Sequence, residues 1–186
     1  MKRPNTPAPT GKLVLDAVGM TQKIDELGQQ LMKEFGPDCA GLALVGIQTR
    51  GAHLARRLAS WLMQKTKQEI PIGILDITLY RDDVHTIAEQ PAVKETDLPF
   101  DLEDRPIILV DDVLFTGRTV RSAMNAIIDY GRPRCIRLAV LIDRGYREFP
   151  ISANYVGLTL QTQRADIVDV NMRETDESDS VYVRPS

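Results

Sequence analysis

The chain has 186 residues, of which 43% are hydrophobic and 26% are charged. A chain of this length and composition is able to bury a core and form one compact domain. Its net charge of -3 excludes a polycation that binds nucleic acid or anionic membrane by bulk charge, although a local basic patch remains allowed.

Cysteine usage and hydropathy narrow the class of protein further. Cys39 and Cys135 are the only cysteines, and no Cys and His residues cluster at metal-ligand spacing, which argues against a disulfide framework or a structural zinc site. No apolar run reaches the roughly 18 residues of a membrane span. Residues 1–10 contain three prolines and predict a flexible N-terminus without the apolar stretch of a signal peptide. We therefore expect a cytoplasmic protein with one domain over residues 11–186.

The first predicted elements alternate between helix and strand. Apolar side chains at helical spacing predict amphipathic helices over residues 20–35 and 52–65. Residues 42–47 form a nearly continuous apolar run, which is typical of a strand buried on both faces. Residues 72–80 alternate in polarity and are rich in Ile, so they predict another strand.

An acidic stretch, residues 81–104, follows this strand. It contains eight acidic and two basic side chains and shows no clear period. More than 20 residues is too long for a simple connection in a compact domain. The stretch is therefore predicted to lie outside the core, as either a mobile functional loop or a hairpin arm.

The second half of the chain continues the alternation. Residues 118–130 predict a helix, and Met124 on its apolar side is expected in the core together with Trp61 of the preceding helix. Apolar runs predict further strands over residues 107–110, 136–142 and 155–160. Strands that alternate with helices predict the α/β class, with right-handed crossovers and a mainly parallel central sheet flanked by helices.

The most informative segment is IILVDDVLFTGRT, residues 107–119. An apolar strand ends in two carboxylates, Asp111 and Asp112, and a short loop over residues 116–119 opens the next helix. In open α/β sheets, ligands bind beyond the carboxyl ends of the strands. The two acids are therefore candidates for ligand binding.

The loop has the properties of a phosphate site. Gly117 lets the backbone approach a ligand closely, while the free N–H groups of a helix start and the hydroxyls of Thr116 and Thr119 suit a phosphate monoester. Adjacent carboxylates suit vicinal sugar hydroxyls, either directly or through Mg²⁺. A phosphate together with a diol indicates a ribose 5-phosphate. The pattern is common, so an ordinary strand-to-helix junction remains the alternative, whereas the P-loop and Rossmann fingerprints are both absent from the sequence.

At these residues the chain resembles a known family. VDDVLFTGRT is similar to the 5-phosphoribosyl-1-pyrophosphate (PRPP) signature of the type I phosphoribosyltransferases, and its wider context resembles the PyrR family of pyrimidine operon regulators and uracil phosphoribosyltransferases. The supporting stretches are residues 44–59, 74–84, 108–120 and 131–151. The resemblance implies a type I phosphoribosyltransferase fold, in which a flexible loop or hairpin and a small hood accompany the central sheet.

The resemblance also implies roles for individual residues. Asp111 and Asp112 would hold the ribose hydroxyls, Arg50 would neutralise the leaving pyrophosphate, and Arg81 would swing over the site on the acidic loop. These four are the implied catalytic residues. The full implied PRPP-binding set is Thr49, Arg50, Gly51, Arg81, Asp111, Asp112, Val113, Leu114, Phe115, Thr116, Gly117, Arg118 and Thr119.

The pyrimidine would be contacted by a second segment, Asp143-Arg144-Gly145, in part through its backbone. Phe115 bears on the choice of base, because 6-oxopurine phosphoribosyltransferases typically carry an acid at this position. The implied reaction converts uracil and PRPP to UMP and pyrophosphate without a covalent nucleophile. Mg²⁺ would arrive bound to PRPP, and no direct ligation of a metal by side chains is expected.

Two other functions remain open. The resemblance also implies an RNA-binding attenuation regulator of the pyr operon that senses UMP, and a PRPP-binding protein without catalysis is the third possibility. Residues 118–147 carry seven basic and two acidic side chains, but residues 152–163 contain no Lys or Arg. A surface that follows RNA phosphates needs several cations in register, so RNA is the less favoured partner. The family resemblance further implies a homodimer or a larger homo-oligomer.

Overall fold

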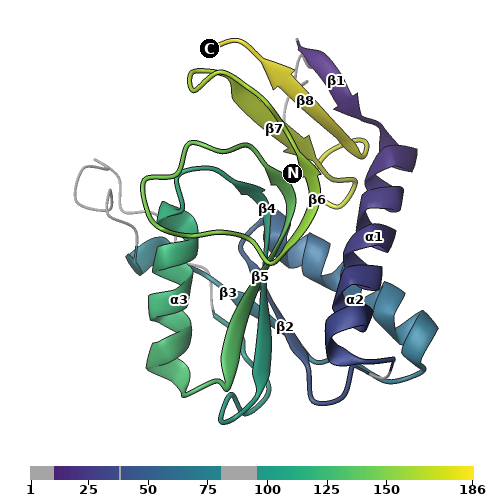
Figure 1. The fold of residues 1–186 in the computed structure, drawn as a ribbon, viewed down its shortest axis with the longest axis vertical. Coiled ribbons are helices and arrows are strands. Elements are labelled where there is room, and N and C mark those ends of the chain that lie inside the picture. Colours follow the sequence, from purple (N-terminus) through teal and green to yellow (C-terminus); the bar gives the residue numbers. More distant parts are fainter. Residues whose placement is uncertain (1–10, 38, 81–95) are drawn as a thin grey trace.

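The computed structural model describes residues 11–37, 39–80 and 96–186, which contain two β-sheets and three α-helices (Figure 1). The larger sheet has five parallel strands in the order β3-β2-β4-β5-β6, and the smaller one has three antiparallel strands in the order β1-β8-β7. The elements are β1 (Lys12–Leu15), α1 (Ala17–Phe35), β2 (Ala43–Ile47), α2 (Arg50–Thr66), β3 (Ile72–Leu75), the short 3-10 helix η1 (Thr78–Tyr80), β4 (Pro106–Leu114), α3 (Arg118–Tyr130), β5 (Cys135–Asp143), β6 (Tyr155–Thr159), β7 (Ile167–Asn171) and β8 (Ser180–Arg184).

The parallel sheet is covered on both faces. Helices α1 and α2 lie on one face and α3 lies on the other (Figure 1). Along β4, Ile108 and Val110 pack into the core under α1 and α2, while Ile107 and Leu109 pack into the core under α3. A strand buried on both faces has apolar residues at successive positions, which confirms the interpretation of the apolar runs.

Two predicted strands have different limits in the structure. Strand β3 ends at Leu75, and η1 replaces the rest of the strand predicted over residues 72–80. Strand β4 runs to Leu114 rather than ending at Val110, and within it Asp111 is paired with Val140 of β5. The two acids therefore lie in the last half of the strand and not beyond it, because strand pairing with β5 continues past the apolar run.

The core predictions on the helices were half right. Trp61 packs against the core and contacts Gly28 of α1, where an added Cβ would come within 2.2 Å of the indole ring. Met124 of α3 was expected in the core but is 36% exposed, and Ile128 one turn later is 59% exposed. The buried positions of α3 are Val120, Ser122, Ala123, Ala126 and Ile127.

The acidic stretch falls into two parts. Residues 1–10 and 81–95, which include the predicted flexible N-terminus and most of the predicted loop, lie outside the described residues. In the described part, Asp97 bridges to Ile74 of β3, and Leu102 is 3% exposed. Residues 97–102 thus belong to the folded body, which corrects the prediction of a loop extending to residue 104. Apolar side chains at every second position, Leu98, Phe100 and Leu102, carry this packing.

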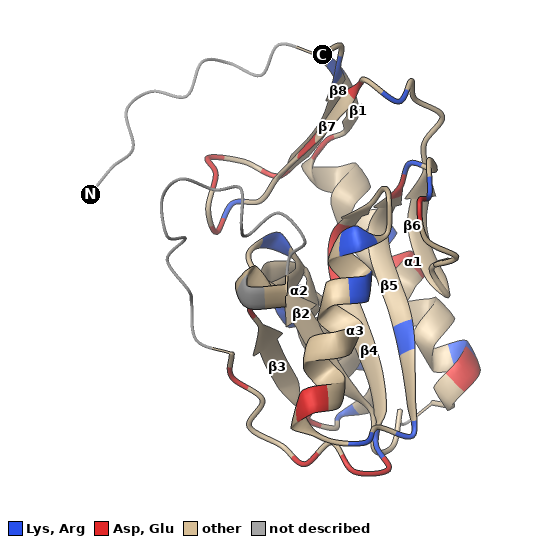
Figure 2. Ribbon diagram, turned by 90° about the vertical axis from the view of Figure 1, so that its left-hand side faces the viewer, with Lys and Arg blue, Asp and Glu red and all other residues tan. Residues whose placement is uncertain are grey.

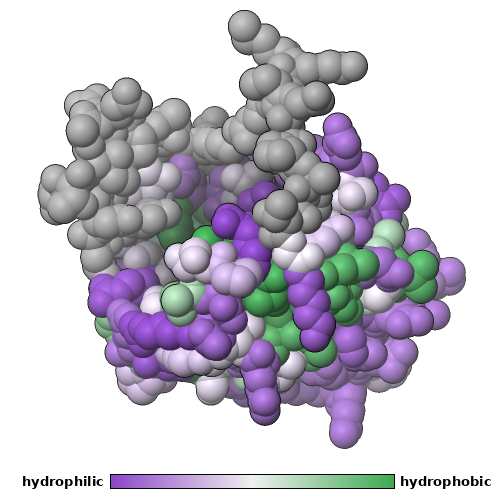
Figure 3. Space-filling view, turned by 90° about the horizontal axis from the view of Figure 1, so that it is seen from above, coloured by the Kyte–Doolittle hydropathy of each residue, from purple (hydrophilic) through white to green (hydrophobic). Residues whose placement is uncertain are grey.

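The small antiparallel sheet forms the hood of the molecule. It joins β1 near the start of the chain to β7 and β8 near its end (Figure 1). Figure 3 looks onto this end of the molecule, where hydrophilic side chains surround an area of apolar surface. No helix in the described ranges is both long and apolar enough to cross a membrane.

Candidate active site

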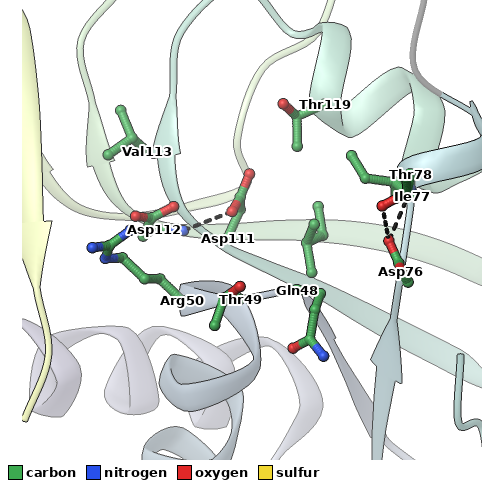
Figure 4. A pocket seen from close by; sticks show the side chains of 11 residues that line it. Gln48, Thr49, Arg50, Asp76, Ile77, Thr78, Asp111, Asp112, Val113 and Thr119 are labelled. Carbon is green, nitrogen blue, oxygen red and sulfur yellow. Dashed lines mark hydrogen bonds between the residues drawn. The ribbon is translucent and has the colours of Figure 1, made fainter. Parts of the chain in front are cut away.

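A cavity of about 350 Å³ opens at the carboxyl ends of β2, β3 and β4 (Figure 4). From β2 the chain passes through α2 to β3, which pairs with one edge of β2. It then crosses to β4, which pairs with the opposite edge of β2. This reversal is a topological switch point, the place where open α/β sheets bind their ligands. The cavity is lined by Ile47, Gln48, Thr49, Arg50, Asp76, Ile77, Thr78, Asp111, Asp112, Val113 and Thr119.

The turn from β2 into α2 forms the first wall. The Gln48–Thr49 peptide bond is cis, and Thr49 is the N-cap residue of α2 but makes no side-chain capping bond. Gly51 allows the helix to start against β4, since a Cβ at this position would lie 2.4 Å from the carbonyl oxygen of Val110. This close approach places Arg50, the first residue of α2, next to the acids of β4.

The two acids of β4 form the second wall. Asp111 is buried, and its Oδ1 accepts a hydrogen bond of 2.9 Å from the N–H of Asp112. Burial, reinforced by the charge of Asp112, raises the pKa of Asp111 well above its usual value. Burial also raises the pKa of Asp112, while the hydrogen bond with Asp111 and the positive charge of Arg50 oppose the rise. In Figure 4, the Arg50 guanidinium lies beside the Asp112 carboxylate.

The third wall is the start of α3. Gly117 is the N-cap residue of this helix, with a φ of 91° in the left-handed region that favours glycine, and it has no side chain to cap the helix. The Arg118 N–H makes a long hydrogen bond of 3.4 Å to the Thr116 hydroxyl. The other first-turn N–H groups of such a helix are available to a ligand, and the positive end of the helix dipole favours an anion. Thr119 points into the cavity from the first turn, whereas Arg118 forms an ion pair of 2.7 Å with Glu148 at the surface.

Arg144 and Phe115 form a stacked pair near the end of β5. Arg144 is 6% exposed, and its guanidinium lies 4.3 Å from the centroid of the Phe115 ring. The same guanidinium donates hydrogen bonds to the carbonyl oxygens of Gln163 (2.8 Å) and Asp166 (2.7 Å). The side chain of Arg144 is therefore used to hold the connection between β6 and β7.

The comparisons with known proteins agree with this arrangement. A family model described as "Phosphoribosyl transferase domain" matches residues 12–175. A protein from Deinococcus radiodurans named "Bifunctional protein PyrR" is 58% identical over 140 residues, which cover 75% of this chain and 76% of the relative. A protein of the same name from Thermus thermophilus is 48% identical over 168 residues, covering 90% of this chain and 92% of the relative. The chain belongs to the phosphoribosyltransferases and, among them, to the PyrR family.

Solved structures show the same fold. The hypoxanthine phosphoribosyltransferase of Trypanosoma cruzi, in a structure that concerns its C-terminal region, superposes with a TM-score of 0.71 at 16% identity and covers 96% of this chain and 94% of its own. The hypoxanthine phosphoribosyltransferase of Staphylococcus aureus superposes with a TM-score of 0.64 at 22% identity and covers 92% of this chain and 90% of its own. The protein thus has the type I phosphoribosyltransferase fold.

The structure brings part of the predicted PRPP set together around the cavity. Its lining includes Thr49, Arg50, Asp111, Asp112, Val113 and Thr119. The members that do not line it are Gly51, Leu114, Phe115, Thr116, Gly117 and Arg118, and the predicted base-binding residues Asp143, Arg144 and Gly145 do not line it either. Arg81 lies outside the described residues.

Sequence reasoning missed the cavity-lining residues at and just after the ends of β2 and β3. Asp76 is buried, and its Oδ1 accepts hydrogen bonds from the N–H (2.9 Å) and Oγ1 (2.5 Å) of Thr78, which shapes η1 at the cavity edge. The signal that could have identified Asp76 is its place directly after an apolar strand, the same signal that identified Asp111. The other missed lining residues are Ile47, Gln48, Ile77 and Thr78.

The donor set indicates how a magnesium ion would fit this site. Within the described ranges, no three or more His, Cys, Asp or Glu side chains gather as a group that could hold a metal ion. Mg²⁺ keeps several waters and binds through one or two carboxylates together with substrate phosphates. The pair Asp111 and Asp112 fits an ion of that kind, or the hydroxyls of a sugar, better than a cage made only of protein ligands.

Proposed function

We propose that this protein transfers the 5-phosphoribosyl group of PRPP to uracil, giving UMP and pyrophosphate. One observation carries the proposal. The carboxylate pair of β4, the start of α3 and the guanidinium of Arg50 surround one cavity at the switch point of the sheet. These are the three groups that a ribose, its 5-phosphate and its pyrophosphate would need.

Each wall of the cavity binds a different part of PRPP. Asp111 and Asp112 accept hydrogen bonds from the ribose hydroxyls, and residues 116–119 hold the 5-phosphate through backbone N–H groups and the Thr119 hydroxyl. The turn at Thr49 and Arg50 holds the pyrophosphate, because a guanidinium binds phosphate oxygens in a bidentate geometry.

The chemistry follows from this placement. Carbon 1 of the ribose gains oxocarbenium-like character as the bond to pyrophosphate breaks and the bond to a ring nitrogen of uracil forms. Arg50 neutralises charge on the leaving group, and the remaining walls orient the two reactants. We also assign Arg81 to this step, on the family resemblance. A bound Mg²⁺ would neutralise further charge on the pyrophosphate and order its oxygens.

The residue that precedes Thr116 and Gly117 in the phosphate loop favours uracil over a purine as the base. Phe115 occupies this position, and its ring packs against Arg144 and, edge to face, against Tyr146. An aromatic ring covered in this way offers no carboxylate to a purine. On the family resemblance, we propose that uracil is read in part by backbone groups of residues 143–145. In this structure the N–H groups of Arg144 and Gly145 donate to Leu114 and Asp143. We further propose that residues 11–186 act as one domain in a homo-oligomer.

Removing both negative charges of β4 tests the proposal. We expect the double variant Asp111→Asn with Asp112→Asn to lose UMP formation by on the order of 10³-fold, because neutral amides bind the developing charge and the diol less well. Asp169→Asn in β7 is the matched control, and it should keep wild-type turnover. Turnover of the double variant within about tenfold of wild type, with an unchanged circular dichroism spectrum, would contradict the assigned role.

A second function has one observation in its favour. The relatives from Deinococcus and Thermus are both named bifunctional, and the family resemblance implies binding to the leader RNA of a pyrimidine operon. If the chain shares this function, filter binding at moderate salt will show tighter binding to that RNA with UMP than without it. Equal affinity in both conditions would exclude a UMP-sensing regulator.

A further inference from the structure

Asp176 lies next to the candidate pyrophosphate site although it belongs to the hood. It is part of the connection between β7 and β8, and 126 residues separate it from Arg50 in the sequence. Its Oδ2 accepts a hydrogen bond from Nη2 of Arg50 at 3.4 Å. Arg50 is thus placed between two carboxylates, Asp112 on the side of β4 and Asp176 on the side of the hood.

The carboxylate of Asp176 is held by its own turn. Its Oδ2 also accepts hydrogen bonds from the backbone N–H of Met172 and from the hydroxyl of Thr175, both at 2.9 Å. The backbone of the turn is closed by N–H groups of Thr175 and Asp176 that donate to the carbonyl oxygen of Met172. The position of Asp176 is therefore set by local bonds that do not involve Arg50.

The same connection is clamped to helix α2. Arg57 stands seven residues after Arg50, which is about two helical turns and the same side of the helix. Its Nε and Nη2 donate to the Glu174 carboxylate at 2.8 and 2.6 Å, and Nη2 also donates to Asp179 at 2.6 Å. The connection and the first turns of α2 are fixed to each other, so Asp176 offers Arg50 a stationary acceptor.

This geometry assigns a task to Asp176. The bond to Arg50 is long, and the Arg50 side chain is 40% exposed, so the pair is a weak contributor to stability. Its effect is on orientation, since a long, free arginine side chain loses rotamer entropy when it binds a ligand. We propose that Asp176 is a positioning residue that holds Arg50 at the cavity wall ready for the pyrophosphate group, an inference that rests on the proposed function.

Ligand binding measured by calorimetry tests this inference. In the presence of Mg²⁺, Asp176→Asn should weaken the binding of PRPP and of pyrophosphate by about tenfold, because Arg50 must then be ordered by the ligand. The affinity for UMP should stay within about twofold of wild type, because UMP lacks the pyrophosphate group. Asp176→Glu should restore part of the PRPP affinity.

Matched variants separate positioning from a general loss of structure. Asp169→Asn changes a carboxylate of the hood that contacts Arg184 rather than Arg50 or Arg57, so it should leave PRPP affinity near wild type. In an Arg50→Lys background, Asp176→Asn should have little further effect.

The outcomes are distinguishable from those of the proposed function. A wild-type protein that fails to bind PRPP would contradict the proposed function. A wild-type protein that binds PRPP while Asp176→Asn binds it equally well would overturn the inference. Equal weakening of PRPP and UMP by Asp176→Asn would also overturn it.

Discussion

At the scale of single residues, Asp111 and Asp112 place two neighbouring carboxyl groups in the central strand of a parallel sheet. Burial raises the pKa of both groups, and the charge of Asp112 raises that of Asp111 further. A pKa that is raised in the folded chain means that the ionised group opposes folding. The carboxylates that we assign to the ribose therefore lower the stability of the protein at neutral pH.

Replacing one of the two carboxylates should show how much its charge lowers the free energy of unfolding. Asp111→Asn keeps an oxygen that accepts from the N–H of Asp112 but removes the charge, so we expect the free energy of unfolding at pH 7 to rise by on the order of 1 kcal/mol. Protonation of Asp111 favours the fold fully below the ordinary carboxyl pKa, and this contribution is lost as the pH rises through the raised folded value.

Urea unfolding at two pH values measures the effect. The difference between Asp111→Asn and wild type should be present at pH 7 and should disappear near pH 3, where the carboxyl group is protonated in both the folded and the unfolded chain. A variant that is less stable than wild type at pH 7 would show that ionised Asp111 has stabilising partners.

At the scale of elements, the site depends on how closely α2 approaches the sheet. Gly51 packs its backbone against β4, and Gly46 in β2 packs against α2, where an added Cβ would lie 2.5 Å from the Cα of Ala52. Both neighbours are backbone atoms, which cannot rotate away as a side chain can. The two glycines thus set the distance between Arg50 and the acids of β4.

Gly51→Ala should separate the helix from the strand. The added methyl group would meet the carbonyl oxygen of Val110, and we expect a loss of roughly 2–4 kcal/mol in the free energy of unfolding together with weaker PRPP binding. Gly19→Ala in α1 is the control, because its nearest neighbour is the movable end of the Leu15 side chain. Thermal unfolding should show the control within about 0.5 kcal/mol of wild type; an equal stability of the two variants would contradict the packing argument.

The elements that the sequence predicted well are those with a single strong pattern. Strands β2, β4 and β5 are buried on both faces, so they appear as continuous apolar runs. The hood strands β7 and β8 are only five residues long, mix apolar with polar side chains without a regular period and lie in an acidic tail, so they give no signal that is long enough to recognise. Half of the candidate site could be predicted because Asp111 and Asp112 follow an apolar run. The link between Arg50 and Asp176 could not, because only tertiary packing brings together residues 126 positions apart.

At the scale of the whole molecule, charged side chains are used mainly to join elements. The basic residues of the stretch 118–147 are spread from the start of α3 along β5 to the opposite end of the sheet (Figure 2). Several are paired within the protein, with Arg137 bonded to Glu34 and Arg147 bonded to Asp143. Because these basic residues are spread out and several form ion pairs, the net positive charge of the stretch does not form one basic surface.

Ion pairs also connect the hood to the body, through Asp179. The side chain of Asp179 is 2% exposed, and burial alone would raise its pKa, but hydrogen bonds from Arg57 and Arg173 lower it to about 2. A lowered pKa contributes stability that is present above the ordinary carboxyl value and is lost as the pH falls through about 2. The ion pairs that join the hood to α2 therefore stabilise the fold at neutral pH and lose this effect in strong acid.

Asp179→Asn should open this clamp. We expect a loss of roughly 3 kcal/mol in the free energy of unfolding at pH 7, because Arg57 and Arg173 both lose a buried partner. The loss should shrink between pH 4 and about pH 2, where Asp179 of the wild type also becomes neutral. Asp169→Asn, which removes a half-exposed partner of Arg184 in the same sheet, should stay within about 1 kcal/mol of wild type in urea unfolding. Equal effects of the two variants would contradict a buried clamp.

The central claim is that the cavity at the switch point transfers phosphoribose to uracil. Release of pyrophosphate from PRPP and Mg²⁺, followed in a coupled assay after addition of uracil or of hypoxanthine, tests it most directly. We predict release that depends on uracil and is at least about tenfold faster than with hypoxanthine. A protein that binds PRPP but releases no pyrophosphate with uracil, or one that prefers hypoxanthine, would contradict the claim.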